Sequence, residues 1–330
     1  MRRRDVLSLL GGALASWPCR ADSQPPDRMR AIGVMIGFAE TDPMAALRIA
    51  NFEQGLRELG WINGRNIQVH YRLATKRELL QAHARDLMAL KPDLIVAGNS
   101  VVTATLLQEN CTLPIVFVTA VNPVSDGFVS ALQRPGGNLT GFTNCSPSIG
   151  GKWLELLKEI APGVARVSIL YNPDTATRSL SFFLPLVEAV AASVAVEPIV
   201  SPVRSPAELD SAISDLARDE GHGLMVIPDP FMSVHRARII EQAARLKLPA
   251  IYPFTYYATE GGLVACGVDM LDLYRRTSVY VDRILRGSKP ADLPVQAPAK
   301  VDLVINLRTA EAMGLSVPRI LIARANEVIE

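Results

Sequence analysis

Short apolar runs alternate with stretches of helical spacing along the first half of the chain. A short apolar run predicts a buried strand, and apolar residues every three or four positions predict a helix. The apolar stripe of the first such helix consists of Ile49, Phe52, Leu56 and Leu59. Strands that alternate with helices are typical of a parallel sheet covered on both faces. The predicted strands are Ala31–Phe38, Ile67–Leu73, Leu94–Ala97 and Ile115–Thr119.

The same alternation begins again in the second half of the chain. Ser205 and Glu208 have the spacing of a capping box, and Pro206 occupies the first helical position, so a helix is expected to start there. A second sheet, with its own helices, is therefore predicted. Its strands are Val167–Tyr171, Val196–Val200, Leu224–Ile227 and Ala250–Tyr252, and its helices include Lys152–Ile160, Thr177–Ala192 and Val234–Lys247.

The last part of the chain indicates how the two halves are connected. It contains a predicted strand at Gly262–Cys266, a helix at Leu271–Leu285, and a final strand at Val301–Leu307. These elements are too few for a third domain, so each must join a sheet that already exists. The chain then crosses several times between two lobes, which is the geometry of a hinged clamp. The predicted fold class is α/β with two lobes, each a parallel sheet flanked by helices.

Composition is consistent with two lobes and argues against nucleic acid as a partner. The chain has 330 residues, of which 49% are hydrophobic, enough for two domains with buried cores. Its 34 Lys and Arg residues nearly balance its 33 Asp and Glu residues. Without a basic excess, binding to a phosphate backbone is not expected.

The first residues have the pattern of an export signal, which we assign to residues 1–21. Arg2, Arg3 and Arg4 precede the apolar run Val6–Trp17, which is too short to span a bilayer. The Arg3-Arg4 pair resembles a twin-arginine signal, and the Sec route remains an alternative. Cleavage is expected after Ala21, with a lipid anchor on Cys19 as the rival interpretation. The signal predicts a periplasmic protein.

No enzyme motif is found, and neither a catalytic residue, a metal site nor a cofactor is expected. There is no Gly-x-Ser-x-Gly elbow, no P-loop and no dinucleotide fingerprint. The four histidines lack the spacing of metal ligands. Outside the signal, three cysteines remain, Cys111, Cys145 and Cys266, and the sequence leaves open whether any two of them pair.

Many short segments, in order along the chain, carry a resemblance to a known family. The chain resembles the substrate-binding proteins of ABC transporters, whose best-known members bind tryptophan and other aromatic amino acids. The segments that carry the resemblance are Leu59-Gly60 to Ile67, Pro114 to Val118, Asn122-Pro123-Val124, Arg134 to Gly141, Asn172-Pro173, Gly261 to Val264, Leu273 to Arg276, Val281-Asp282, Leu303 to Asn306 and Arg324 to Val328.

The resemblance implies a class I periplasmic-binding-protein fold with a ligand between the lobes. It assigns residues 30–143 and 262–288 to one lobe, and residues 144–261 and 300–330 to the other. It further implies a monomer that captures a small solute, an amino acid or a related small carboxylate, by hinge closure and delivers it to an ABC permease in the inner membrane. The alternative is a periplasmic sensor that signals to another partner.

The candidate ligand-binding residues follow from the predicted sheets. In open α/β sheets, ligands bind outside the carboxyl ends of the strands. The residues at or just after these ends are Phe38, Asn99, Ser100, Thr119 and Asn122 in the first lobe, Tyr171, Asn172, Asp229 and Tyr252 in the second, and Cys266 near a crossing.

Two of these residues suggest a chemistry. Ser100 opens a predicted helix, whose N-terminus would hold a carboxylate, although a plain N-cap is the alternative. Asp229 ends a strand between Pro228 and Pro230 and would pair with an ammonium group, although a cap or turn role is the alternative. Together they suit a zwitterionic amino acid that bridges the lobes.

Two departures from the family pattern affect the ligand. Asn122 stands where Asp is expected before Pro-Val, and Cys266 stands where an aromatic residue is common. The identity of the ligand therefore cannot be carried over from the aromatic-amino-acid binders. A larger or branched apolar side chain, or another class of compound, is expected to fill the space beside Cys266.

Overall fold

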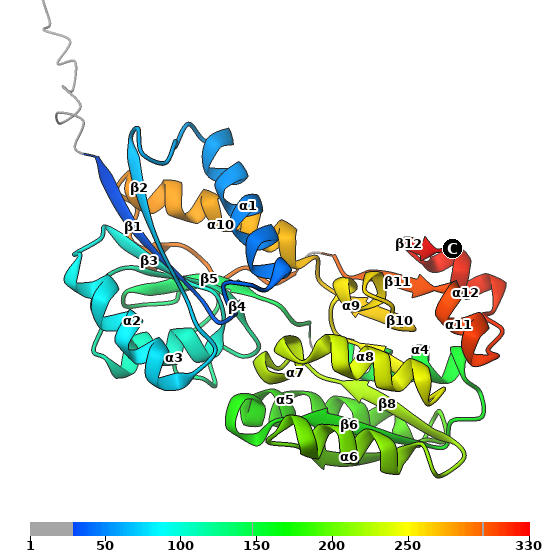
Figure 1. Ribbon diagram of the computed structural model, residues 1–330. Helices are drawn as coiled ribbons and strands as arrows, with labels where there is room; N and C mark the ends of the chain where they lie inside the picture. Colours follow the sequence, from blue (N-terminus) through cyan, green and yellow to red (C-terminus); the bar gives the residue numbers. More distant parts are fainter. Residues whose placement is uncertain (1–28, 147, 299) are drawn as a thin grey trace, which may run out of the picture.

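The protein consists of two α/β lobes joined by a three-segment hinge (Figure 1). The computed structural model describes residues 29–146, 148–298 and 300–330. The export signal predicted at residues 1–21 lies outside the described residues. Within them, no helix is both long enough and apolar enough to cross a membrane.

The first lobe is built on a five-stranded sheet in which all neighbouring strands are parallel. The strand order is β2-β1-β3-β4-β5, so the direction of winding reverses between β1 and β3. Such a switch point leaves a crevice outside the carboxyl ends of the two strands. The strands are β1 (Arg30–Ile36), β2 (Ile67–Leu73), β3 (Leu94–Ala97), β4 (Ile115–Ala120) and β5 (Leu139–Thr143).

Helices cover both faces of this sheet because strand side chains alternate between the two faces. Val34 and Ile36 belong to the core under α1 (Pro43–Glu58) and α10 (Met270–Leu285). Met35 and Ala97 belong to a separate core under α2 (Arg77–Ala89) and α3 (Ser100–Gln108). Helix α10 comes from late in the chain, so the first lobe is completed only after the second has been traversed.

The second lobe is built on a seven-stranded sheet of order β12-β11-β10-β9-β8-β6-β7. Its winding reverses between β6 and β8, as the first sheet's does between β1 and β3. Only the β10–β11 pair is antiparallel among the described strands, a departure from the all-parallel sheet predicted for this lobe. The strands are β6 (Arg166–Tyr171), β7 (Glu197–Pro202), β8 (His222–Val226), β9 (Ala250–Tyr252), β10 (Val264–Gly267), β11 (Asp302–Asn306) and β12 (Glu327–Ile329).

The helices of the second lobe also lie on both faces of their sheet. Helices α4 (Ile149–Ile160) and α5 (Pro173–Ala191) cover one face, and α6 (Pro206–Leu216) and α8 (Arg236–Arg245) cover the other. The remaining helices are α7 (Pro230–Val234), α9 (Thr255–Thr259), α11 (Leu307–Met313) and α12 (Arg319–Arg324), with a 3₁₀ turn at Pro290–Asp292 in the other lobe.

Three described segments connect the lobes: the chain after β5, the link from β10 to α10, and the return after the 3₁₀ turn. The return segment runs beside β5, where Phe142 pairs with Gln296 and the Thr140 hydroxyl donates to the Leu293 carbonyl oxygen at 2.6 Å. Segments that cross side by side restrict the relative motion of the lobes to a hinge.

One lobe boundary differs from the expected one. Residues 262–288 were expected to lie together in the first lobe, but the structure divides them. Strand β10 pairs with β9 and β11 in the second sheet, and only α10 packs on the first. The end of β10 lies directly against the chain that follows β9, since Gly267 passes so close to the Pro253 carbonyl oxygen that there is no room for a Cβ atom.

Several elements were predicted differently or not at all. Strand β5 contains Thr140, Gly141 and Thr143 and lacks a continuous apolar run, so hydrophobicity alone does not reveal it. The helix predicted over Val234–Lys247 corresponds to α8, which begins only at Arg236 because His235 has non-helical backbone angles, and the short helix α7 before it was not predicted. Helix α12 and strand β12 were not predicted.

Cys111, Cys145 and Cys266 are free and buried, so the pairing that the sequence left open is absent among the described residues.

Candidate functional site

A cavity lies between the two lobes, at the switch points of both sheets. Its free volume in this arrangement of the lobes is about 60 Å³, well below the roughly 300–1,000 Å³ of most small-molecule sites. Both lobes and the hinge contribute side chains. The lining residues are Phe38, Arg48, Gly98, Asn99, Ser100, Thr119, Val121, Asn144, Thr175, Ser179, Pro228, Asp229, Pro230, Ser233, Phe254 and Met270.

The first lobe contributes the ends of β1, β3 and β4. Asn99 caps α3, its side-chain oxygen accepting from the Val102 N–H at 2.9 Å. Ser100, the first residue of that helix, lines the cavity, so the cap role belongs to Asn99. The Thr119 hydroxyl donates to the Gly98 carbonyl oxygen at 3.1 Å, which joins the ends of β3 and β4. The N-terminus of α3 thus faces the cavity on a rigid support.

The second lobe contributes Asp229, which is 3% exposed. One carboxylate oxygen accepts from the Asn172 N–H at 2.6 Å, and the other accepts from the Thr175 hydroxyl at 2.6 Å and the Phe231 N–H at 2.7 Å. Asp229 therefore caps α7 and ties the end of β8 to the start of α5. Burial raises the pKa of this carboxyl, and the hydrogen bonds only partly oppose that effect.

Five of the sequence-predicted residues line the cavity together: Phe38, Asn99, Ser100, Thr119 and Asp229. The other five do not line it. Asn122 accepts from the Ser125 N–H in the turn after β4, and Asn172 caps α5. Tyr171 packs at the margin of the core under α4 and α5.

Tyr252 and Cys266 are core residues. The Tyr252 ring stacks on Tyr257 with centroids 5.0 Å apart. Cys266 is fully buried against α4, and its carbonyl oxygen accepts from the Trp153 indole at 2.6 Å. The space expected beside Cys266 therefore belongs to the core of the second lobe and not to the cavity.

Arg48, the one Arg or Lys among the described lining residues, was not predicted from the sequence. It lies in α1 between Met44 and Phe52, one turn from each, and is 4% exposed. Its guanidinium carbon is 4.2 Å from the Phe38 ring centroid. The available signal was its position: Arg48 is a charged residue four positions before Phe52, on the same face of the helix. The predicted apolar stripe began instead at Ile49, the next residue.

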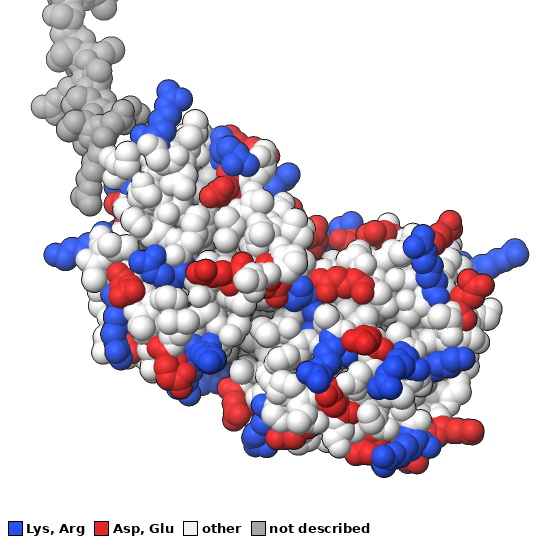
Figure 2. Space-filling model, in the orientation of Figure 1, with Lys and Arg blue, Asp and Glu red and all other residues white. Residues whose placement is uncertain are grey.

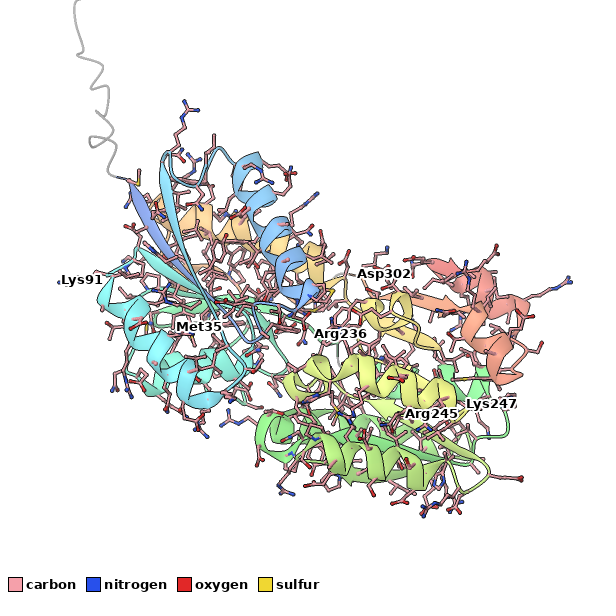
Figure 3. The ribbon with its side chains drawn as sticks, viewed as in Figure 1. Met35, Lys91, Arg236, Arg245, Lys247 and Asp302 are labelled. Atoms are coloured by element: carbon pink, nitrogen blue, oxygen red, sulfur yellow. The ribbon has the colours of Figure 1, made fainter. Side chains whose placement is uncertain are left out.

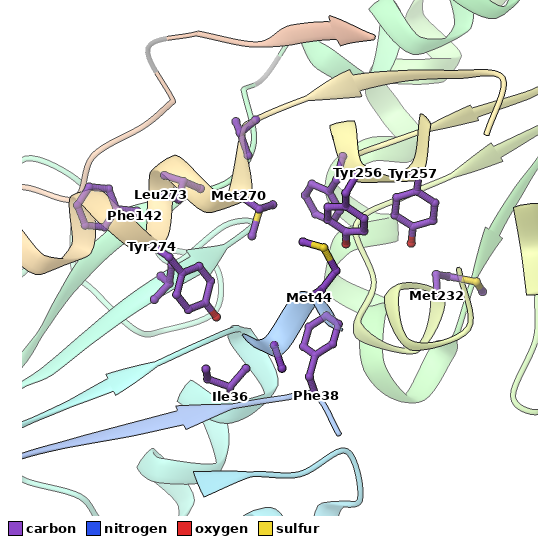
Figure 4. Close-up of a cluster of buried hydrophobic side chains, with 14 of the residues drawn as sticks. Ile36, Phe38, Met44, Phe142, Met232, Tyr256, Tyr257, Met270, Leu273 and Tyr274 are labelled. Carbon is purple, nitrogen blue, oxygen red and sulfur yellow. The ribbon is translucent and has the colours of Figure 1, made fainter. Parts of the chain in front are cut away.

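The aromatic rings near Arg48 come from both lobes, and Figure 4 labels them as Phe38, Tyr256 and Tyr274. Its guanidinium carbon is 5.5 Å from the Tyr274 ring of α10 and 5.9 Å from the Tyr256 ring of α9. Both tyrosines are buried, and burial raises the pKa of each phenol, while the guanidinium has the opposite, smaller effect. Both phenols are therefore neutral near pH 7.

Two ion pairs connect the lobes. Arg236 of α8 forms a bidentate pair with Asp42, at 2.9 and 3.0 Å, and also binds Glu260 of its own lobe at 2.8 Å. Arg236 lies where the lobes meet (Figure 3). Arg178 of α5 binds Asp126 of the first lobe at 3.2 Å. Acidic and basic side chains are also seen meeting along the lobe boundary in Figure 2. Both pairs link the first lobe to the second.

Comparison with known proteins gives one family and several relatives. A family described as ABC transporter substrate binding protein matches residues 32–329. A tyrosine-binding protein from Clostridioides difficile (strain R20291) is 25% identical over 266 residues, covering 80% of this chain and 75% of the relative.

Two solved structures are also similar. A conserved domain protein from Vibrio cholerae O1 biovar El Tor is 27% identical, with a TM-score of 0.83, covering 91% of this chain and 100% of that chain. An ABC domain in complex with L-Trp from Streptococcus pneumonia is 23% identical, with a TM-score of 0.83, covering 92% and 100%. The two-sheet architecture is the class I periplasmic-binding-protein fold, as the resemblance implied.

Proposed function

This chain belongs to the ABC transporter substrate-binding protein family, and from that premise we propose that it captures an amino acid or related small carboxylate in the periplasm for an ABC importer. The family consists of binding proteins, not enzymes. The observation that carries the proposal is the cavity between the lobes, which both sheets line at their switch points.

The amino-acid class is supported by the relatives and by the lining. The Clostridioides difficile relative is named for tyrosine, and the structure from Streptococcus pneumonia holds L-Trp. In this chain the cavity combines the N-terminus of α3, a buried carboxylate at Asp229, and apolar surface from Phe38, Phe254 and Met270. A zwitterion with an apolar side chain matches these groups.

The proposed mechanism is hinge closure around the solute. A ligand shifts an equilibrium between open and closed forms only if it binds one form more tightly. Because the cavity wall contains Ser100 from one lobe and Ser233 from the other, a bound solute gains its full set of contacts only when the lobes meet. The closed form then offers a surface composed of both lobes to the permease.

The first test is a thermal-shift panel of the amino acids on purified protein that has been unfolded and refolded to remove bound ligand. A specific ligand at about 100 times its Kd stabilises the folded state by about 2.7 kcal/mol. We expect a concentration-dependent rise in Tm with at least one amino acid. A panel without any such rise contradicts the amino-acid assignment and leaves the fold unaffected.

The placement of the ligand is tested by Ser100→Ala. The Ser100 hydroxyl lines the cavity and has no hydrogen-bond partner within the described chain, so its loss should leave the Tm of the free protein nearly unchanged. Removing a hydrogen bond to a charged group costs about 1.5–3 kcal/mol, so the ligand should bind roughly 10- to 100-fold more weakly by calorimetry. Ser211→Ala, on the exposed side of α6, is the matched control. Equal affinity in both variants would mean that the ligand lies elsewhere.

The importer role is tested in the source organism. Deleting the gene should abolish high-affinity uptake of the labelled ligand, and restoring the gene should restore it. Normal uptake together with a lost transcriptional response to the ligand would favour the sensing alternative.

A further inference from the structure

Arg48 and Arg236 are both buried arginines near the cavity, but their charges are compensated differently. Arg236 is 6% exposed and binds two carboxylates, Asp42 and Glu260. Arg48 is 4% exposed and forms no ion pair with any described carboxylate. Its Nε atom is buried without a hydrogen-bond partner. The same fold thus contains one fully compensated guanidinium and one without a counter-ion.

The neighbouring rings do not compensate the charge of Arg48. A cation–π contact stabilises a charge by much less than the removal of that charge from water costs. Tyr256 and Tyr274 are neutral phenols, because burial raises the pKa of each. The rings therefore orient the guanidinium and exclude water from it, but they leave its charge unpaired.

We propose that Arg48 is the counter-charge for a monocarboxylate group of the solute, an inference that rests on the proposed solute-binding function. A guanidinium presents parallel N–H groups that match the two oxygens of a carboxylate. Among the described lining residues, Arg48 is the only cation and Asp229 the only carboxylate. A single cation opposite a buried carboxylate suits a monoanion and disfavours a phosphate dianion.

The arrangement also orients the solute. Its carboxylate lies toward Arg48 and the first lobe, so a positive group on the same molecule lies toward Asp229 and the second lobe. Arg48 is held between the Phe38 ring of its own lobe and the Tyr256 ring of the other, so the anion site is complete only when the lobes meet. Carboxylate recognition and lobe closure are thereby coupled.

The inference predicts a sharp discrimination between acids and their neutral derivatives. An amino-acid amide retains size, shape and ammonium group but lacks the anion, so Arg48 stays unpaired. Leaving one partner of a buried charged pair without its counterpart costs affinity steeply, and we expect the amide to bind about 100-fold more weakly than the acid.

The experiment compares wild type, Arg48→Met, Arg48→Lys and the exposed control Arg57→Met of the same helix. Each is titrated calorimetrically with the amino acid found in the panel and with its amide. We expect wild type and Arg57→Met to prefer the acid, Arg48→Lys to keep a reduced preference, and Arg48→Met to bind acid and amide equally weakly. Equal binding of acid and amide by wild type, or unchanged acid binding by Arg48→Met, overturns the inference while leaving solute capture intact.

A second readout separates a binding role from a structural one. Removing an unpaired buried charge should leave the Tm of the ligand-free protein unchanged or raise it. A Tm several degrees lower in ligand-free Arg48→Met would mark Arg48 as a structural residue and overturn the inference.

The panel also includes monocarboxylates without an amino group: pyruvate, hexanoate and 4-hydroxyphenylacetate. If only these raise the Tm of wild type, the amino-acid assignment fails and the inference about Arg48 stands. If neither amino acids nor these acids raise it, both fail.

Discussion

At the scale of single residues, the two charged side chains of the cavity wall, Arg48 and Asp229, differ in whether they already have partners. Asp229 already accepts three hydrogen bonds within its own lobe, whereas Arg48 has no anionic partner in the described chain. Hydrogen bonds to backbone N–H groups stabilise a carboxylate, but burial acts in the other direction. Asp229 therefore stabilises the second lobe through its hydrogen bonds and also lines the cavity.

The burial of Asp229 has a consequence for the pH dependence of stability. Its pKa in the folded protein lies above the usual value of about 3.9. The native state therefore binds more protons than the unfolded state in the range above that value, and stability falls as pH rises through the folded pKa. Asp229→Asn removes this titration.

The measurement is urea unfolding of wild type and Asp229→Asn from pH 4 to pH 7. We expect the free energy of unfolding of wild type, minus that of the variant, to fall as the pH rises. The altered hydrogen bonds of the variant add an offset to this difference that does not change with pH. A difference that is flat or rises with pH would mean that hydrogen bonding outweighs burial at this carboxyl.

At the scale of elements, the contact between α1 and α10 holds the first lobe together. The helices approach closely at Gly55, where a Cβ atom would lie 2.5 Å from the Arg275 carbonyl oxygen and also too close to the Ser278 hydroxyl. Helix α1 carries Arg48, and α10 begins at a hinge crossing with Met270 in the cavity wall. The glycine therefore sets the distance between two elements of the site.

Gly55→Ala tests this contact. In an exposed helix interior, alanine is more stable than glycine by about 1 kcal/mol. At Gly55 we expect the opposite sign, a loss of about 1–3 kcal/mol in the free energy of unfolding, because the added methyl group overpacks the contact. The intrinsic difference is calibrated by Ala50→Gly, on the exposed side of α1. A higher free energy of unfolding for Gly55→Ala would show that α10 can move away from α1 without destabilising the protein.

At the scale of the whole molecule, ion pairs across the cleft bias the lobes toward closure. Asp42 caps α1 through the Met44 N–H at 2.9 Å, and the same carboxylate binds Arg236 of the other lobe. The Asp42 and Arg236 side chains are only 12% and 8% exposed, so the contact is well shielded from water. In an open form both groups would be hydrated instead.

Asp42→Asn separates the cap from the cross-lobe charge. Asparagine still caps the helix, but it presents an amide in place of the carboxylate that faces Arg236. We expect the ligand-free protein to be more open, with a larger radius of gyration by small-angle scattering, and the ligand to bind about tenfold more weakly, because the closed form is less populated. The matched control is Asp269→Asn, which removes the charge from the cap of α10. Unchanged scattering and affinity would mean that the pair does not control closure.

Much of the fold and part of the site follow from the sequence by itself. Apolar periodicity predicted most strands because it records which side chains face a core, and each strand needs only its own residues to show that pattern. The rule that ligands bind at strand ends identified five residues that line one cavity: Phe38, Asn99, Ser100, Thr119 and Asp229.

Only the tertiary structure decided what depends on distant segments. Whether β10 joins the first or second sheet depends on its pairing with β9 and β11, which its own residues do not encode. Five other candidates also follow or end strands, but their side chains do not line the cavity: Asn122, Tyr171, Asn172, Tyr252 and Cys266. The sequence does not show that the charge of Arg48 is unpaired, because its burial depends on rings from α9 and α10, which are distant in the chain. The reason is physical: periodicity is local along the chain, whereas burial and charge compensation are set by side chains that folding brings together.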